Sequence, residues 1–303
     1  MGEFDQVNPS MRKDWEPNFE IELPPLPRTV TEVSKLLAEE TDPPDTPRLV
    51  EIVKADPVIG TSVLRRINSA YYGMRTRVVE IDKATQLLGF EEVCDIVLTA
   101  GVMKLGDIFE TETQIEIFDR IMELSLGAAT YTKMIADKYD IPQKSIGFTT
   151  GLLHTVGRLI LLYNRPNDYE ALWFTTEKGR PPTVTSEQII FGTDHAELSA
   201  LAGEEWRLPE NAVTVMRFYL TPGHINLQPS RVLALCLAVA SAATDHYCLN
   251  ETERTGTEFA PPAAMYALAR QLDVKPNVLS EYITSQRDDV LRFIRSMVDP
   301  KTD

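Results

Sequence analysis

Two histidines occupy places where an imidazole could carry chemistry. His154 interrupts the apolar run Gly151–Leu161, and His195 follows Asp194 at the start of a predicted helix. A catalytic divalent metal needs several anionic or imidazole ligands that converge on one point, where the metal acidifies a bound water. Two imidazoles alone are too few. We therefore interpret His154 as a core histidine bonded to backbone or hydroxyl groups, and Asp194 as the N-cap that places His195 in the first helical turn.

The cysteines offer no stronger site. Cys94, Cys236 and Cys248 include no C-x-x-C pair. His246 lies ten residues after Cys236 and two before Cys248, separations that do not share a helical face, so no zinc site is expected. An odd cysteine count without a disulfide framework is typical of a reducing cytoplasm. The motifs of a serine nucleophile elbow, a phosphate-binding loop and a dinucleotide-binding turn are also absent.

The overall charge argues against polyanionic partners. The 303 residues carry 30 Lys and Arg against 45 Asp and Glu, a net charge of −15. A field of that sign repels phosphate backbones and anionic lipids, so we expect neither general nucleic-acid binding nor membrane association. The apolar run Val232–Ala243 is too short to span a bilayer and is predicted to be a buried core helix. No positively charged apolar leader opens the sequence, and we expect a cytoplasmic protein.

One local exception to the acidic field is an arginine cluster, formed by Arg65, Arg66, Arg75 and Arg77. Guanidinium forks bind carboxylates and phosphates in a fixed geometry, so this cluster is a candidate site for an acidic partner helix, a phosphorylated domain or a cyclic nucleotide. The alternative, which the acidic composition favours, is pairing with the chain's own carboxylates. Asn68, inside the cluster, is interpreted as a capping and turn residue.

The elements that position these residues are predicted to be helices throughout, which makes the fold class all-α. Thr46-Pro47 and Asp56-Pro57 each place a capping residue before a proline at the first helical position, and Asp82 is a candidate cap for a helix to Leu88. Further helices are expected after Thr29, from about Glu91, and at about 115–138, 144–163, 166–178, 194–206, 209–219, 229–249, 262–273 and 276–298.

Four ordered segments in the N-terminal half carry a family resemblance. They are Leu23–Pro27, Ile52–Pro57, Ile67–Gly73 and Ala84–Gly89. With the stretches around His154 and His195, they resemble the HDOD family, a non-catalytic relative of the HD superfamily of metal-dependent phosphohydrolases. The resemblance reaches from Leu23 to about Leu220. It implies a multi-helix, HD-like helical domain with an additional N-terminal helical subdomain.

We accordingly predict four parts. Residues 1–22 would form a flexible arm, 23–130 the N-terminal subdomain, 131–249 a degenerate HD-like core, and 250–303 a C-terminal loop and helices that pack on the core.

The resemblance also implies where a catalytic relative would hold metal. The matching, vestigial positions are His154, Thr155, His195, Phe218, Tyr219 and Ser241. Aspartate would follow the first histidine and would also stand at the last position, and a His-His pair would replace Phe218 and Tyr219. No resident metal or other cofactor is therefore expected. Arg158, where catalytic relatives usually have lysine, is a candidate anion contact in the vacated cleft.

The function implied by the resemblance is a bacterial signal-transduction or regulatory module that acts by protein or ligand binding, without catalytic turnover. One alternative is a divergent metal-dependent phosphohydrolase acting on a nucleotide or cyclic dinucleotide. Another is direct sensing of a small ligand in the cleft near His154. The expected partners are signalling proteins, with a nucleotide or cyclic dinucleotide as candidate ligand and a homodimer as candidate assembly.

Overall fold

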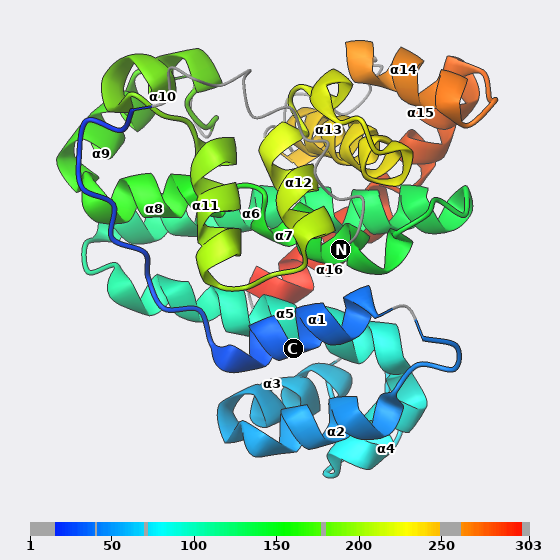
Figure 1. Cartoon of the computed structure of the whole chain (residues 1–303). Coiled ribbons are helices and arrows are strands. Elements are labelled where there is room, and N and C mark those ends of the chain that lie inside the picture. The colour runs from blue at the N-terminus through cyan, green and yellow to red at the C-terminus, as the bar shows by residue number, and fades with distance from the viewer. Residues whose placement is uncertain (1–15, 40, 70–71, 177–179, 249–261, 299–303) are drawn as a thin grey trace, which may run out of the picture.

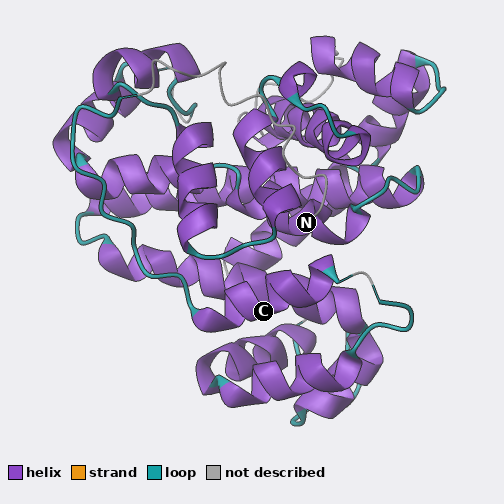
Figure 2. Cartoon of the chain, viewed as in Figure 1, coloured by secondary structure: helices purple, strands orange, loops and turns teal. Residues whose placement is uncertain are grey.

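The computed structural model describes residues 16–39, 41–69, 72–176, 180–248 and 262–298 (Figure 1). Within these ranges the chain forms helices and loops and contains no strand, so the all-α prediction is confirmed (Figure 2). The N-terminal unit comprises α1 (Arg28–Ala38), α2 (Thr46–Ala55), α3 (Pro57–Ile67), α4 (Ile81–Leu88) and α5 (Phe90–Met103). A short 3₁₀ helix, η2 (Lys104–Ile108), leads out of it.

The remaining helices build the larger part of the molecule. In chain order they are α6 (Glu112–Lys138), η3 (Lys144–Ile146), α7 (Gly147–Leu153), α8 (Val156–Asn164), α9 (Pro166–Phe174), α10 (Val184–Phe191), α11 (His195–Glu205), α12 (Glu210–Phe218), η4 (Pro222–His224), α13 (Gln228–Cys248), α14 (Ala263–Gln271), α15 (Pro276–Ser285) and α16 (Arg287–Val298). Helix α6 is central, because α7, α13 and α16 all pack on it. Helices α11 and α12 pack on each other and on α8 and α13 respectively.

Helix starts follow the capping chemistry of the sequence, with two corrections. Asp56 caps α3 as predicted, with Oδ1 accepting from the backbone N–H of Val58 and Ile59 at 3.1 Å each. The cap of α2 is Asp45, which accepts from the Arg48 N–H at 3.0 Å, so the prediction of Thr46 was wrong by one residue. Asp82 lies in the first turn of α4 and is not its cap, because the helix begins at Ile81. There its carboxylate favours the helix N-terminus.

Three predicted helices divide or shorten, and one was missed. The expected helix 144–163 is η3, α7 and α8, with a break at His154 and Thr155. The expected helix 276–298 divides into α15 and α16, and α9 ends at Phe174, ahead of the predicted 178. Helix α10 was not predicted. Within the described ranges, residues 144–164 form the only helical stretch that is long and apolar enough to span a bilayer. Of the apolar window within this stretch, 94% is buried inside the structure.

The segment before α1 is docked along the core, as Figure 1 shows in blue. Asn18 donates its backbone N–H to the Phe191 carbonyl at 3.1 Å, and Glu22 and Asn164 exchange two hydrogen bonds of 2.7 and 2.9 Å. Residues 16–22 are therefore held to α8 and the end of α10, which corrects that part of the predicted flexible arm. Residues 1–15 lie outside the described residues.

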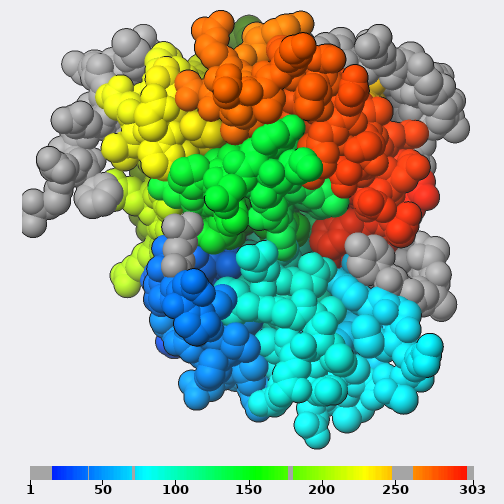
Figure 3. Space-filling view, turned by 90° about the vertical axis from the view of Figure 1, so that its right-hand side faces the viewer, coloured from blue at the N-terminus to red at the C-terminus, as the bar shows by residue number. Residues whose placement is uncertain are grey.

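The N-terminal unit and the core are joined through one continuous helix. The predicted boundary at residues 130 and 131 falls inside α6, whose Lys133 forms an ion pair with Asp95 of α5. Further contacts across this junction are those of α5 with α7, of α1 with η3, and of Arg66 on α3 with Ser296 on α16. At the other end of the chain, the C-terminal helices (orange and red) lie against the core above the N-terminal helices, as Figure 3 shows. Helix α14 packs on α13 and α16 packs on α6, and the predicted loop before them lies largely outside the described residues.

Candidate functional site

His154 ends α7 inside the core. Its side chain is 1% exposed, and Nδ1 lies 2.7 Å from the Gly151 carbonyl oxygen one turn earlier. The ring meets Tyr219 edge to face, with centroids 4.9 Å apart. Burial lowers the pKa of His154 to about 3, although the Gly151 hydrogen bond acts in the opposite direction. The interpretation of His154 as a core histidine with a backbone partner agrees with this geometry.

The helix break after His154 is stabilised by small polar groups. Ser199 of α11 donates its hydroxyl to the His154 carbonyl at 2.9 Å and accepts the Gly157 N–H at 2.8 Å. Thr155 is buried, and its hydroxyl bonds to that of Ser125 on α6. The position that would carry the second metal ligand in a catalytic relative is thus occupied by a neutral hydroxyl with a neutral partner.

Two glycines allow the surrounding helices to approach this closely. A Cβ on Gly157 would lie 2.1 Å from the backbone oxygen of His195, and one on Gly151 would lie 2.4 Å from the Cα of Ala129. Only glycine fits at either position without a shift of backbone. The approach brings α7 and α8 onto α6 on one side and α11 on the other, and so sets the position of both histidines.

His195 is held by a carboxylate that the sequence analysis missed. Glu187 of α10 is fully buried, and its Oε2 accepts from the His195 backbone N–H at 2.9 Å and lies 2.6 Å from the His195 Nδ1. Its Oε1 accepts from the Arg158 Nε at 3.2 Å, and the Arg158 guanidinium also donates to the Pro182 carbonyl at 3.2 Å. The Asp194 cap is confirmed, because Oδ1 accepts from two N–H groups of α11.

The second nitrogen of His195 is bonded to Tyr219. Its Nε2 lies 2.6 Å from the Tyr219 hydroxyl. Burial raises the pKa of Tyr219, so the phenol keeps its proton and can donate it to Nε2. A carboxylate only accepts, which makes Nδ1 the donor to Glu187. Burial alone would lower the pKa of Arg158, but the Glu187 carboxylate raises it above its ordinary value. We call Arg158, Glu187, His195 and Tyr219 the polar chain.

The polar chain is not a metal site. HD-superfamily relatives would use this region for a divalent cation, which needs unshared lone pairs on several anionic or imidazole donors. Here Tyr219 takes the Nε2 lone pair of His195, and Glu187 already bonds to a guanidinium and to two N–H groups. Among the described residues, no group of three or more His, Cys, Asp or Glu side chains is placed to hold a metal. The side chains of the polar chain therefore do not fit the ligand requirements of a divalent metal ion.

The remaining vestigial positions, Phe218, Tyr219 and Ser241, have different surroundings. Phe218 is buried and its ring meets His224, whereas the neighbouring Tyr219 enters the polar chain. Ser241 on α13 lines a pocket of about 720 Å³ together with Tyr219 and Asp245. Neither His154 nor Arg158 lines this pocket. The expectation that Arg158 contacts an anion in the cleft is corrected, because its anion is the internal Glu187.

The arginine cluster divides between the surface and the interior. Arg65, Arg75 and Arg77 are exposed, and within the described part of the chain they form no ion pair or hydrogen bond. Arg66 is 6% exposed and donates to the carbonyl and hydroxyl of Ser296 on α16. For Arg65, Arg75 and Arg77, pairing with the chain's own carboxylates is therefore not seen among the described residues. Asn68 acts as predicted: it caps α3 and exchanges hydrogen bonds of 2.7 Å with the backbone of Val78.

The chain matches one protein-family model and is similar to known proteins in sequence and in structure. The family model of the HDOD domain matches residues 23–222. A protein of Treponema pallidum (strain Nichols), described only as uncharacterized, is 24% identical over 199 residues, which are 65% of this chain and 37% of that protein. This chain thus spans well under half the length of that relative.

Three solved structures share the fold at low sequence identity. An HDOD domain protein of unknown function from Geobacter sulfurreducens has a TM-score of 0.71 at 18% identity, covering 91% of this chain and 93% of that one. A protein of Shewanella amazonensis SB2B, provisionally named a phosphohydrolase, has 0.61 at 22%, covering 91% and 95%. A protein of Marinobacter aquaeolei VT8, provisionally named a signal transduction protein, has 0.64 at 18%, covering 91% and 60%.

Proposed function

Because this chain belongs to the HDOD domain family, which is related to the HD phosphohydrolases, we propose that it is a regulatory module that acts by binding a protein or a ligand, without catalytic turnover. The observation that supports this most strongly is the polar chain. Its arginine, carboxylate, imidazole and phenol satisfy one another and lie buried in the core.

The polar chain leaves few donor atoms for a metal ion. Hydrolysis of a phosphoester in this superfamily depends on a metal that activates water. Such a metal would have to displace the Tyr219 hydroxyl from His195 and the Arg158 guanidinium from Glu187. Removing one partner of a buried ion pair costs about 3–5 kcal/mol, which the metal would have to repay before it gained any binding energy.

The surface available for binding is the exposed part of the arginine cluster. Arg65, Arg75 and Arg77 are exposed on the N-terminal unit of a protein whose net charge is −15, and Arg65 and Arg77 line one pocket. A local positive site on an acidic molecule favours acidic partners that approach in one orientation. We propose signalling proteins with an acidic docking face as the partners of this cluster.

The first test asks for metal and for turnover. The protein is purified without chelator, incubated with Mn²⁺, desalted and analysed for metal, and its hydrolysis of bis(p-nitrophenyl) phosphate and of a cyclic dinucleotide is followed. We expect less than one tenth of an ion per chain and no turnover that His195→Ala removes. About one ion per chain, with turnover that this variant abolishes, would return the phosphohydrolase alternative.

The second test concerns partner binding. Capture of candidate signalling proteins is compared for the wild-type chain, for the double variant Arg65→Glu/Arg75→Glu, and for the control Arg270→Glu on the distant α14. Charge reversal within the cluster is expected to abolish capture, and the control is expected to leave it intact. Equal capture by all three proteins would remove the cluster from the binding surface.

A further inference from the structure

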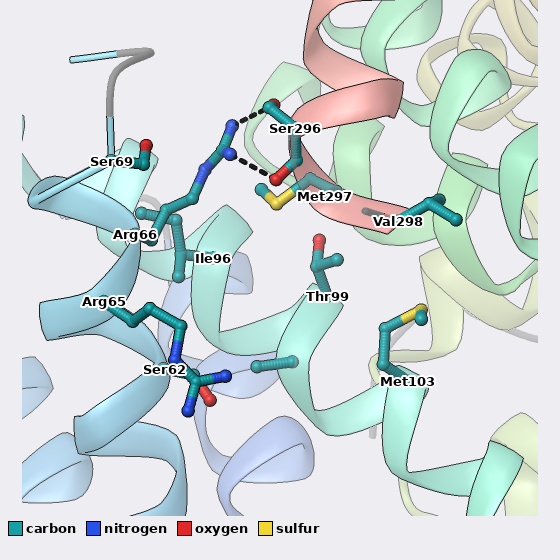
Figure 4. A pocket seen from close by; sticks show the side chains of 11 residues that line it. Ser62, Arg65, Arg66, Ser69, Ile96, Thr99, Met103, Ser296, Met297 and Val298 are labelled. Atoms are coloured by element: carbon teal, nitrogen blue, oxygen red, sulfur yellow. Dashed lines mark hydrogen bonds between the residues drawn. The ribbon is translucent and has the colours of Figure 1, made fainter. Parts of the chain in front are cut away.

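A second site lies where the C-terminal helix meets the N-terminal unit, far from the polar chain. A pocket of about 280 Å³ opens between α3, α5 and the end of α16 (Figure 4). Its polar lining residues are Ser62, Arg65, Arg66, Ser69, Thr99 and Ser296, and its apolar lining residues are Ile96, Ala100, Met103, Met297 and Val298. We call this the α16 pocket. Its volume lies just below the range of about 300–1,000 Å³ for drug-sized ligands, so it suits a smaller molecule.

The pocket contains buried polar groups that the protein does not satisfy. The Thr99 side chain is 2% exposed, and its hydroxyl has no hydrogen-bond partner among the described residues. In Figure 4 this hydroxyl points from α5 toward Met297 at the end of α16. The Ser69 hydroxyl, at the rim, also has no partner there. A buried hydroxyl without a partner destabilises the fold, and a ligand oxygen in the pocket would supply the missing hydrogen bond.

The charge of the pocket selects the sign of its ligand. Among the described residues its two charged lining residues are both arginines and no carboxylate lines it, although acids outnumber bases by 45 to 30 in the whole chain. Arg66 is fixed by Ser296 and lies beside the rings of Tyr72 and Phe293, which makes it a rigid positive wall. Arg65 is exposed and has no ion pair within the described residues, so its fork can close on an anion.

The apolar half of the lining selects the body of the ligand. Ile96 and Ala100 of α5 and Met297 and Val298 of α16 present hydrocarbon and thioether surface to the same space. Methionine adapts its shape to different apolar groups. We propose that the α16 pocket binds a small monocarboxylate with an apolar tail. The carboxylate is bound by Arg65 with the Thr99 hydroxyl donating to it, and the tail lies between α5 and α16.

This assignment deepens the proposed binding function by naming a ligand class and a consequence. The ligand contacts α3, α5 and α16 at once, and Arg66 already links α3 to α16 through Ser296. Binding therefore stabilises the docking of the C-terminal helix on the N-terminal unit. A metabolite bound there would change how firmly these two parts are held together, next to the exposed arginines.

The test uses hexanoate as the probe, with hexylammonium and 1-hexanol as matched controls of the same chain length and different charge. Binding to the full chain is measured by calorimetry and by thermal shift. We expect saturable binding of hexanoate and none of hexylammonium. Arg65→Gln should weaken hexanoate by about tenfold or more, and the isosteric Thr99→Val by about fivefold, because each removes one hydrogen-bonding group. Arg270→Gln, which changes an exposed arginine on α14 outside the pocket, should leave the affinity unchanged.

A second variant distinguishes a loss of binding from a loss of folding. Ala100→Leu fills the apolar half of the pocket and should abolish hexanoate binding while the circular dichroism spectrum is retained. No binding of hexanoate by the wild-type chain, equal binding of hexylammonium, or affinity unchanged in both Arg65→Gln and Thr99→Val overturns the assignment. Binding of inorganic phosphate or AMP in place of hexanoate also overturns it. These results leave the metal and partner tests above unaffected, so failure here is distinguishable from failure of the proposed function.

Discussion

Replacing His154 with glutamine should flatten the acid side of the stability curve. Burial in the core lowers the pKa of His154 from 6.5 to about 3 in the folded protein. The unfolded chain therefore takes up a proton near pH 6.5, whereas the folded chain does so only near pH 3. Between these values the unfolded state binds more protons, so the free energy of unfolding falls as the pH falls. The stability is fully present above pH 6.5.

The size of the effect follows from the two pKa values. Each pKa unit corresponds to about 1.4 kcal/mol, so the full loss from pH 6.5 to pH 3 would be about 5 kcal/mol. Between pH 7 and pH 5 the expected loss from this one group is about 2 kcal/mol. Glutamine cannot take up the proton. His154→Gln should be less stable at pH 7, because it disturbs the packing against Tyr219, but it should lose about 2 kcal/mol less than the wild-type chain on going to pH 5.

Urea unfolding at pH 7, 6 and 5 measures these differences. The control is His224→Gln, which removes an exposed imidazole and should keep the pH dependence of the wild-type chain. Titration of the many surface carboxylates contributes equally to all three proteins and cancels in the comparison. An identical loss between pH 7 and pH 5 in His154→Gln and in the wild-type chain would refute the inference that this imidazole is buried without its proton.

Three further predictions concern stability and are measured by urea unfolding at pH 7. Glu187→Gln leaves the Arg158 guanidinium buried without its carboxylate and should cost about 3–5 kcal/mol, and adding Arg158→Met should restore most of it; a loss below 1 kcal/mol would show that the pair is not buried. Gly157→Ala places a methyl group against the first residue of α11 and should cost about 3 kcal/mol, whereas Gly223→Ala, whose methyl group would meet only the flexible Arg231 side chain at 3.8 Å, should be neutral; equal effects would contradict the close helix approach. Asp56→Ala removes the cap of α3 and should cost about 1–2 kcal/mol, and no loss would mean that the cap contributes nothing.

The features that the sequence predicted correctly are those encoded locally. Asp56 before Pro57 and Asp194 before α11 identify helix starts because a capping side chain bonds to backbone groups two or three residues away. The all-α class follows from apolar residues repeated at helical spacing, and the core position of His154 follows from its apolar neighbours. Each of these needs only a few consecutive residues.

Helix α10 and its Glu187 were missed because the helix inverts the usual pattern. Its buried residues include the carboxylate of Glu187, whereas Ile189 is 75% exposed and Ile190 also faces solvent. Apolar periodicity therefore gives no inward face. Two local signals could have located the helix: Thr183, whose hydroxyl accepts from the Ser186 N–H, and Gly192, whose φ of 69° ends it.

Contacts between residues that are far apart in the sequence could not be predicted from local sequence patterns. Arg158 bonds to a residue 29 positions away and His195 to Tyr219 24 positions away, and Arg66 meets Ser296 across 230 residues. Nothing in the sequence near these residues specifies which partner the fold will supply. The four cluster arginines were correctly identified as a local excess of positive charge, but their division between surface and interior depends on where α16 ends.

The side chains of the polar chain bond to one another, so substitutions that would build a metal site here would break existing hydrogen bonds. A metal site of the kind that the resemblance implies for catalytic relatives would need acidic side chains at Thr155 and Ser241 and a histidine pair at Phe218 and Tyr219. The last of these replacements removes the hydroxyl that Nε2 of His195 now bonds, and an acid at Thr155 would bury a charge beside the Ser125 hydroxyl. The replacements at Tyr219 and Thr155 would each lower stability before the complete set could hold an ion. If the chain acts by binding, as proposed, the buried polar chain therefore opposes the stepwise formation of a metal site.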